Sequence, residues 1–270
     1  MDKLQQQKRP IGVFDSGIGG LTVANAISRQ LPEEQLIYFG DTAHLPYGDK
    51  SADAIRYYCL QIARFLLDQQ CKMIVIACNS ASSAAYHVLL DFFKTDALFV
   101  NVVDPLVEVV GDRDFKKVGV IATKATISSS IYQRKLREQD PSLEVGALAT
   151  PLLTPMIEEG YFDNTISQVI IQNYLNDPVL QDIDALLLAC THYPLIRGSI
   201  EAYYKKPLDI FDSIDVVAKV VEDKLAARDL LSPKREMPHR FYVSDYTKAF
   251  EETTALFYPS QIALEQRSIW

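Results

Sequence analysis

The sequence is short of basic charge, of long apolar runs and of paired cysteines. Its 270 residues carry 27 Lys and Arg against 35 Asp and Glu, a formal net charge of −8. This balance argues against a nucleic-acid or anionic-membrane surface, because such surfaces need clustered Lys and Arg. No apolar stretch approaches ~18 residues, and the charged start "MDKLQQQKRP" has no apolar core. We therefore expect neither a transmembrane helix nor a signal peptide.

The cysteines are few and widely spaced, at Cys59, Cys71, Cys78 and Cys190. They show neither C-x-x-C spacing nor the density of a secreted disulfide scaffold, so we expect a protein of the reducing cytoplasm. Cys59 lies in a helical pattern and Cys71 just before an apolar run, and neither has polar neighbours. We interpret these two as structural.

Short apolar runs alternate with longer segments of helical period. In residues 51–70, apolar side chains from Ile55 to Leu66 recur every three or four positions, and Ser51 is a suitable N-cap. The runs expected as strands are residues 11–14, 36–39, 73–77, 98–103, 117–122, 143–148, 185–189, 208–211 and 240–243. This alternation predicts an α/β fold with mostly parallel sheets covered by helices on both faces.

Two parts of the chain resemble each other. "KRPIGVFDSG" aligns with "FKKVGVIATK" at an offset of 107 (119 minus 12), and "MIVIACNS" with "ALLLACTH" at 112 (190 minus 78). We predict two similar, doubly wound α/β domains related by pseudo-two-fold symmetry. Residues 1–98 plus 208–270 would form the first domain and residues 99–207 the second. Ligands of such folds bind at the carboxyl ends of the strands, so we expect the active site between the domains.

Cys78 and Cys190 occupy equivalent places in the two repeats. Each ends an apolar strand and precedes polar residues and a helix, and a helix N-terminus lowers a thiol pKa from roughly 8.5 toward neutral. One such cysteine alone is as often a core residue as a functional one. Two at matching positions favour function.

Other interpretations of the two cysteines stay open at this stage. A disulfide between them is disfavoured by a reducing compartment. A zinc site using Cys190 and His192 lacks further ligands, because His44, His87 and His239 are scattered. A nucleophile–base pair of Cys190 and His192 would leave Cys78 without a role.

Two loops carry further candidates. "FDSGIGGLTV" is not G-x-G-x-x-G, so it supports nucleotide binding only weakly. Its glycines suit a tight turn, but a turn alone does not explain Asp15 and Ser16 beside them. "GDTAHLPYGDKS" places Tyr47 and Gly48 in a polar loop stiffened by Pro46.

Two thiols on opposite sides of one small molecule suit the inversion of a stereocentre. A thiolate removes a proton from one face and a thiol returns one to the other. An amino-acid α-proton is very weakly acidic, so directed donors must hold the substrate and stabilise the carbanion-like charge. Asn79, Ser80, Thr191 and backbone N–H groups could do this, and Asp15 and His192 could assist the cysteines.

Four motifs carry a resemblance to a known family: "VFDSGIGGLTV", "YFGDTAHLPYG", "ACNSAS" and "ACTHYPL", in order within residues 11–195. Together they resemble the glutamate racemase family of the aspartate/glutamate racemase superfamily. The resemblance implies a cofactor-independent, metal-free racemase with Cys78 and Cys190 as its acid/base thiols. It implies Asp15 as the assistant of Cys78, with His192 and Glu158 near Cys190.

The resemblance also implies substrate contacts, a substrate and a pathway. The implied contacts are Asp15, Ser16, Tyr47, Gly48, Asn79, Ser80, Thr191 and His192. The implied reaction interconverts L- and D-glutamate and supplies D-glutamate for bacterial peptidoglycan. Ser80 stands where the family usually has Thr, Ala189 where it has Gly, and His44 where Arg is common. These departures leave the preference for glutamate over aspartate open.

The sequence is compatible with several hypotheses of function. The nearest alternative is a racemase for aspartate or another amino acid, and more distant ones are a cysteine-nucleophile amidohydrolase and an amino-acid binding or redox-sensing protein. We expect a small-molecule substrate, no nucleic acid and no membrane partner, and a homodimer stays open. The stretch 247–270 has a helical pattern and ends in aromatic residues that suggest packing.

Overall fold

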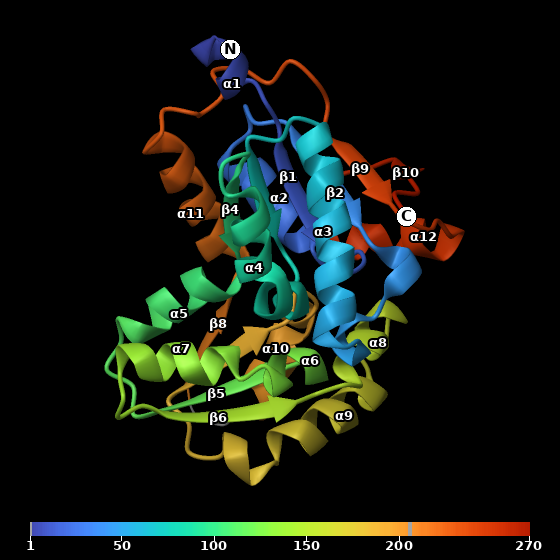
Figure 1. Cartoon of the computed structure of the whole chain (residues 1–270). Helices are drawn as coiled ribbons and strands as arrows, with labels where there is room; N and C mark the ends of the chain where they lie inside the picture. The colour runs from blue at the N-terminus through green and yellow to red at the C-terminus, as the bar shows by residue number, and fades with distance from the viewer. Residues whose placement is uncertain (1, 205–206) are drawn as a thin grey trace.

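The computed structural model describes residues 2–204 and 207–270, which form two parallel sheets, one above the other in Figure 1. The strands are β1 (Ile11–Asp15), β2 (Leu36–Gly40), β3 (Met73–Ile76), β4 (Leu98–Asn101), β5 (Lys117–Ala122), β6 (Glu144–Ala149), β7 (Ala185–Ala189), β8 (Asp209–Asp212), β9 (Arg240–Val243) and β10 (Leu264–Gln266). The first sheet has the order β10-β9-β2-β1-β3-β4, and the second has the order β6-β5-β7-β8.

The helices connect these strands. They are α1 (Lys3–Gln7), α2 (Leu21–Gln30), α3 (Ala52–Asp68), α4 (Asn79–Phe93), α5 (Val103–Gly111), α6 (Lys124–Ser128), α7 (Ile131–Gln139), α8 (Leu153–Glu158), α9 (Thr165–Leu175), α10 (Arg197–Tyr203), α11 (Ile214–Ala226) and α12 (Lys248–Phe257). Short 3₁₀ turns are η1 (Thr42–His44), η2 (Tyr47–Asp49), η3 (Pro178–Leu180) and η4 (Tyr193–Ile196).

The central strands are buried on both faces. Every residue of β1, β2, β3 and β7 is buried, as expected for parallel strands covered by helices. The expected helix over 51–70 is confirmed, since α3 begins after Ser51, whose hydroxyl accepts a hydrogen bond from the Ala54 N–H. Its buried face runs from Ile55 to Leu66.

The internal repeat corresponds to a repeat in topology. The order β2-β1-β3-β4 of the first sheet recurs as β6-β5-β7-β8 in the second, with every one of these pairs parallel. The aligned segments therefore form equivalent strands, β1 with β5 and β3 with β7. The predicted α/β fold of two similar domains is confirmed.

The predicted domain boundaries are wrong at two strands. Residues 98–101 form β4, which pairs with β3 in the first sheet (Ile74 opposite Phe99). Residues 209–212 form β8, which pairs with β7 in the second sheet (Leu187 opposite Phe211). The physical reason is that β3 and β7 are buried strands whose second edge needs a hydrogen-bonding partner. The chain crosses between the sheets after each fourth strand, at α5 and α11.

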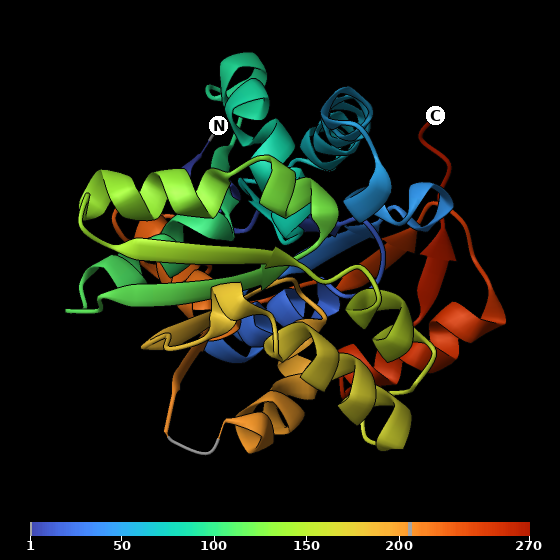
Figure 2. The ribbon, with the colours of Figure 1, turned by 90° about the horizontal axis from the view of Figure 1, so that it is seen from below.

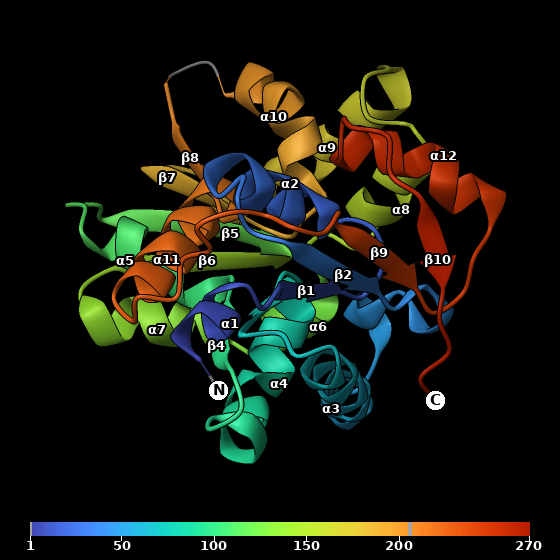
Figure 3. The same cartoon turned by 90° about the horizontal axis from the view of Figure 1, so that it is seen from above.

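Helices cover both faces of each sheet and fill the space between the two halves. Seen from below in Figure 2, the light-green helix α7 lies on one side of the second sheet, and the yellow and orange helices α9 and α10 lie on the other. Figure 3, from above, shows α11 beside α2. A continuous hydrophobic core joins residues of both halves, such as Val75 and Ile121.

The C-terminal segment packs on the first sheet. The helix expected in 247–270 ends at Phe257, because Pro259 lacks the N–H that a helix needs, and residues 264–266 add β10 as an edge strand. At the amino ends of β2 and β3, a buried ion pair joins Lys72 Nζ to Glu34 Oε2 at 2.6 Å.

Among the described helices, none has the length and apolar character needed to cross a bilayer.

Candidate active site

A cavity lies where the carboxyl ends of the two sheets meet. Ligands of α/β folds bind at this end of the strands. Its lining comes from both halves of the chain: Ser16, Pro46, Tyr47, Gly48, Asp49, Cys78, Asn79 and Ser80 from the first, and Thr123, Lys124, Pro151, Thr154, Pro155, Cys190, Thr191 and His192 from the second. Both candidate thiols therefore line the same cavity.

Cys78 is the N-cap residue of α4, two residues after the end of β3 at Ile76. Its Sγ accepts a hydrogen bond from the Ala81 N–H at 3.4 Å. The thiol also donates a hydrogen bond to Ser16 Oγ, with 3.6 Å between the sulfur and the oxygen. We expected the helix N-terminus to lower the thiol pKa; the Ala81 N–H does act in that direction, but burial outweighs it. Burial, with the neighbouring Asp15 carboxylate adding to it, raises the pKa of Cys78 to about 12.

Cys190 follows β7 at the equivalent place, with different neighbours. Its Sγ lies 3.7 Å from His192 Nδ1 and 3.5 Å from Thr154 Oγ1. The chain continues into the 3₁₀ turn η4 rather than directly into an α-helix. Cys190 thus faces an imidazole and a hydroxyl, whereas Cys78 faces a hydroxyl and a helix N-terminus.

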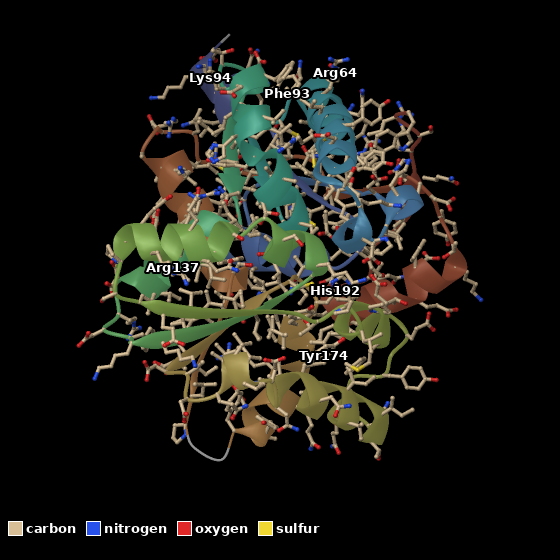
Figure 4. All side chains as sticks on the ribbon, turned by 60° about the horizontal axis from the view of Figure 1, so that its bottom comes forward. Arg64, Phe93, Lys94, Arg137, Tyr174 and His192 are labelled. Carbon is tan, nitrogen blue, oxygen red and sulfur yellow. The ribbon has the colours of Figure 1, made fainter. Side chains whose placement is uncertain are left out.

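His192 is a buried histidine held between a thiol and a carboxylate. Its Nε2 lies 3.0 Å from Glu158 Oε1, and in Figure 4 it lies toward the middle of the molecule, while Arg64, Lys94 and Arg137 lie at the margin. Burial alone would lower its pKa, but the bonds with Cys190 and Glu158 outweigh burial and raise the pKa of His192 to about 10. The ring is therefore an imidazolium at neutral pH.

Asp15 lies behind the cavity wall at the end of β1. Its Oδ2 accepts hydrogen bonds from the N–H groups of Gly17 at 3.1 Å and Gly20 at 3.0 Å, and no described residue bonds its buried Oδ1. Burial raises the pKa of Asp15, although His192 and the two N–H groups act in the opposite direction. A carboxylate with one open acceptor beside a thiol can take part in proton transfer.

The glycine loop brings the two halves into contact. A Cβ added at Gly19 would overlap the His192 ring and lie 2.6 Å from Thr191 Oγ1. One at Gly48 would lie 2.9 Å from Thr123 Cβ. These two glycines are required by close approach across the site.

Polar side chains of α4 bridge the two halves. Ser80 Oγ lies 2.8 Å from Thr123 Oγ1, and Tyr132 OH donates to Asn79 Oδ1 at 2.6 Å. The Asn79 amide nitrogen is buried and makes no hydrogen bond with any described residue. This donor is free to bind a ligand oxygen.

Nearly all of the predicted site residues lie around the cavity. Cys78, Cys190, Ser16, Tyr47, Gly48, Asn79, Ser80, Thr191 and His192 line it directly, while Asp15 and Glu158 stand one layer behind. Thr123, Lys124 and Thr154 are lining residues that sequence reasoning missed. The repeat offered a signal for one of them, because an offset of 107 places Thr123 opposite Ser16. Nothing in the sequence pattern marked Thr154.

The arrangement suits proton transfer at two faces of one molecule. Two thiols from equivalent strands share the cavity, and each has a titratable neighbour, Asp15 near Cys78 and His192 near Cys190. In the two described ranges, no cluster of three His, Cys, Asp or Glu side chains could hold a metal ion. None of the four cysteines forms a disulfide.

Known proteins share both sequence and fold with this chain. A family model described as Asp/Glu/Hydantoin racemase matches residues 11–221. Glutamate racemase of Chlorobaculum tepidum is 40% identical over 259 residues, covering 94% of this chain and 93% of the relative. The structure of glutamate racemase from Francisella tularensis in complex with D-glutamate has a TM-score of 0.91 and 37% identity, covering 97% of this chain and 98% of that one. Thermus thermophilus glutamate racemase with beta-chloro-D-alanine has a TM-score of 0.88 and 38% identity, with the same coverage.

Fold, cavity and relatives agree on one class of enzyme, the amino-acid racemases, which are isomerases that act on amino acids. The match spans most of the chain and includes both cysteine segments. This chain belongs to the Asp/Glu/hydantoin racemase family.

Proposed function

We propose that the chain interconverts L- and D-glutamate by a two-base 1,1-proton transfer, with no cofactor. The observation that carries the proposal is that Cys78 and Cys190, from equivalent strands of the two sheets, line the same cavity. The choice of glutamate is supported by relatives of this name, one of which is described in complex with D-glutamate. We further propose a cytoplasmic role in supplying D-glutamate for peptidoglycan.

The reaction breaks one C–H bond and forms another at the same carbon. A thiolate takes the α-proton, and the electron pair stays on Cα, delocalised into the carboxylate. The opposite thiol then gives its proton to the other face of Cα. The product is the mirror image of the substrate, and the two cysteines end with their protonation states exchanged.

We assign the resting thiol to Cys78. A pKa of about 12 keeps Cys78 protonated at neutral pH. The imidazolium of His192, 3.7 Å from the Cys190 sulfur, compensates a negative charge there. Glu158 holds this imidazolium, and Asp15 assists Cys78.

Substrate carboxylate groups are bound by fixed donors rather than by the net charge of the protein. Asn79 and Ser80 line the cavity at the positive end of α4, and we assign their backbone N–H groups and the Asn79 side-chain amide as donors to the substrate. Thr191, Ser16 and the turn at Tyr47 and Gly48 complete the contacts. The same donors stabilise the carbanion-like charge that forms when the α-proton is removed.

Isotope exchange tests the proposed reaction. In D₂O without added cofactor, the purified protein is expected to convert L-glutamate to D-glutamate carrying deuterium at Cα, as measured by NMR and chiral chromatography. Faster exchange with aspartate would assign the sister activity. A lack of α-exchange with both enantiomers of both amino acids would overturn the proposal, and a single trapped thioester would indicate a hydrolase.

Glu158→Gln is expected to move the alkaline limb of the pH–rate profile. His192 is protonated below its pKa of about 10, so activity that needs the imidazolium is retained below that pH and lost above it. Loss of the Glu158 charge lowers the pKa of His192, and we expect the limb of kcat/KM to shift down by about one pH unit. The matched control is Glu159→Gln at the exposed neighbouring position. An unchanged alkaline limb would contradict the proposal that Glu158 raises the pKa of His192.

A further inference from the structure

A buried carboxylate outside the cavity organises the loop that carries Tyr47 and Gly48. Asp41 follows β2 and is fully buried. It accepts hydrogen bonds from Tyr47 OH at 2.6 Å, from Ser244 Oγ at 2.8 Å and from His44 Nδ1 at 2.8 Å. One buried carboxyl group thus fixes a cavity-lining tyrosine, the end of β9 and a histidine that does not line the cavity.

His44 is held in turn by aromatic rings from two distant segments. Its ring stacks on Tyr58 of α3, with centroids 4.2 Å apart and planes at 21°. Trp270 packs against it edge-on at 4.5 Å and also contacts Tyr58 at 5.5 Å. Aromatic pairs with this geometry contribute beyond the area that they bury.

The contacts form one continuous path from Trp270 to the cavity. Trp270 packs on His44, His44 bonds Asp41, Asp41 bonds Tyr47, and Tyr47 lines the cavity beside Gly48. Tyr47 is itself almost fully buried, so its ring cannot move without a shift of the loop. Neither His44 nor Trp270 lines the cavity.

We infer that His44 is a positioning residue, clamped by Tyr58 and Trp270, which sets substrate affinity by holding Asp41 and the loop of Tyr47 and Gly48. The inference rests on the proposed function, because affinity for glutamate is what the loop would control. His44 acts through Asp41 and touches no reacting atom. Its effect should therefore fall on KM, since the thiols that perform proton transfer are left in place.

His44→Leu removes the donor to Asp41 and keeps an apolar side chain against the rings. We expect KM for glutamate to rise about tenfold, the equivalent of one lost bond to a charged group, with kcat within about twofold. His44→Gln retains a side-chain N–H donor and is expected to restore most of the affinity. His87→Leu, at an exposed histidine of α4, is the matched control.

Trp270 supplies a second readout, because it is the only tryptophan in the chain. We expect its emission to change on saturation with D-glutamate in the wild type, and this change to be lost in His44→Leu. Trp270→Leu, a substitution at a partly exposed position that leaves the core intact, is expected to raise KM about threefold. Circular dichroism melts show whether each variant is folded.

The outcomes separate this inference from the proposed function. If the wild type does not turn over glutamate, both fail together. If the wild type is active while folded His44→Leu and Trp270→Leu keep the wild-type KM, the positioning role alone is overturned. A fall in kcat with KM unchanged would also overturn it, since the loop would then act on the chemical step.

Discussion

Cys78→Ala and Cys190→Ala are each expected to slow racemisation by about 10³-fold or more, because each removes the acid or base from one face of the substrate. The remaining thiol can still take a proton from the enantiomer that faces it. It can return a proton only to that same face. Each variant should therefore exchange the α-proton of one enantiomer for deuterium without inversion, and the two variants should act on opposite enantiomers.

The experiment follows deuterium content and enantiomer separately for each variant. Cys71→Ala is the matched control, since Cys71 is a buried thiol that precedes β3, at the opposite end of the strand from Cys78. It should keep the wild-type rate per folded molecule. Inversion by either active-site variant at a rate near wild type would contradict the two-base mechanism.

Lys72→Met is expected to lower the free energy of unfolding by about 3–5 kcal/mol, because it leaves the Glu34 charge buried without its partner. Lys72 Nζ lies 2.6 Å from Glu34 Oε2 and also donates to the carbonyl groups of Gln7 at 2.5 Å and Leu230 at 2.8 Å. The pair thereby ties α1 and the segment after α11 to the amino end of the first sheet.

Urea unfolding measures this loss. The double variant Lys72→Met with Glu34→Leu should recover most of it, since an apolar pair of similar volume removes the unpaired charge. Lys219→Met is the control for an exposed ion pair, as its partners Glu222 and Asp223 lie on the surface of α11, and it should leave the free energy of unfolding close to that of the wild type. Equal effects at Lys72 and Lys219 would contradict the argument from burial.

The secondary-structure elements that depend on a local sequence pattern could be predicted. The strand ending at Asp15 and the strands just before Cys78 and Cys190 were predictable because short apolar runs buried on both faces have no polar alternation. The internal repeat then placed the two cysteines at equivalent positions, and the topology confirms that equivalence.

Other features depend on partners that local pattern does not specify. The sheet to which β4 and β8 belong is decided by pairing with β3 and β7. The raised pKa of Cys78 results from burial and from Asp15, which only the folded chain brings near. Thr154 reaches Cys190 from a separate helix, so no spacing in the sequence could mark it.

The repeated topology has a consequence for how such a site could arise and diverge. Two identical copies of one half, related by an exact two-fold axis, would present the same groups to both faces of the substrate. A single chain is free of that constraint. At the end of the central strand, Asp15 in one half matches Ala122 in the other, and two residues after the thiol, Ser80 matches His192. Joining the halves in one polypeptide therefore permits different residues to stand at the two faces of the substrate.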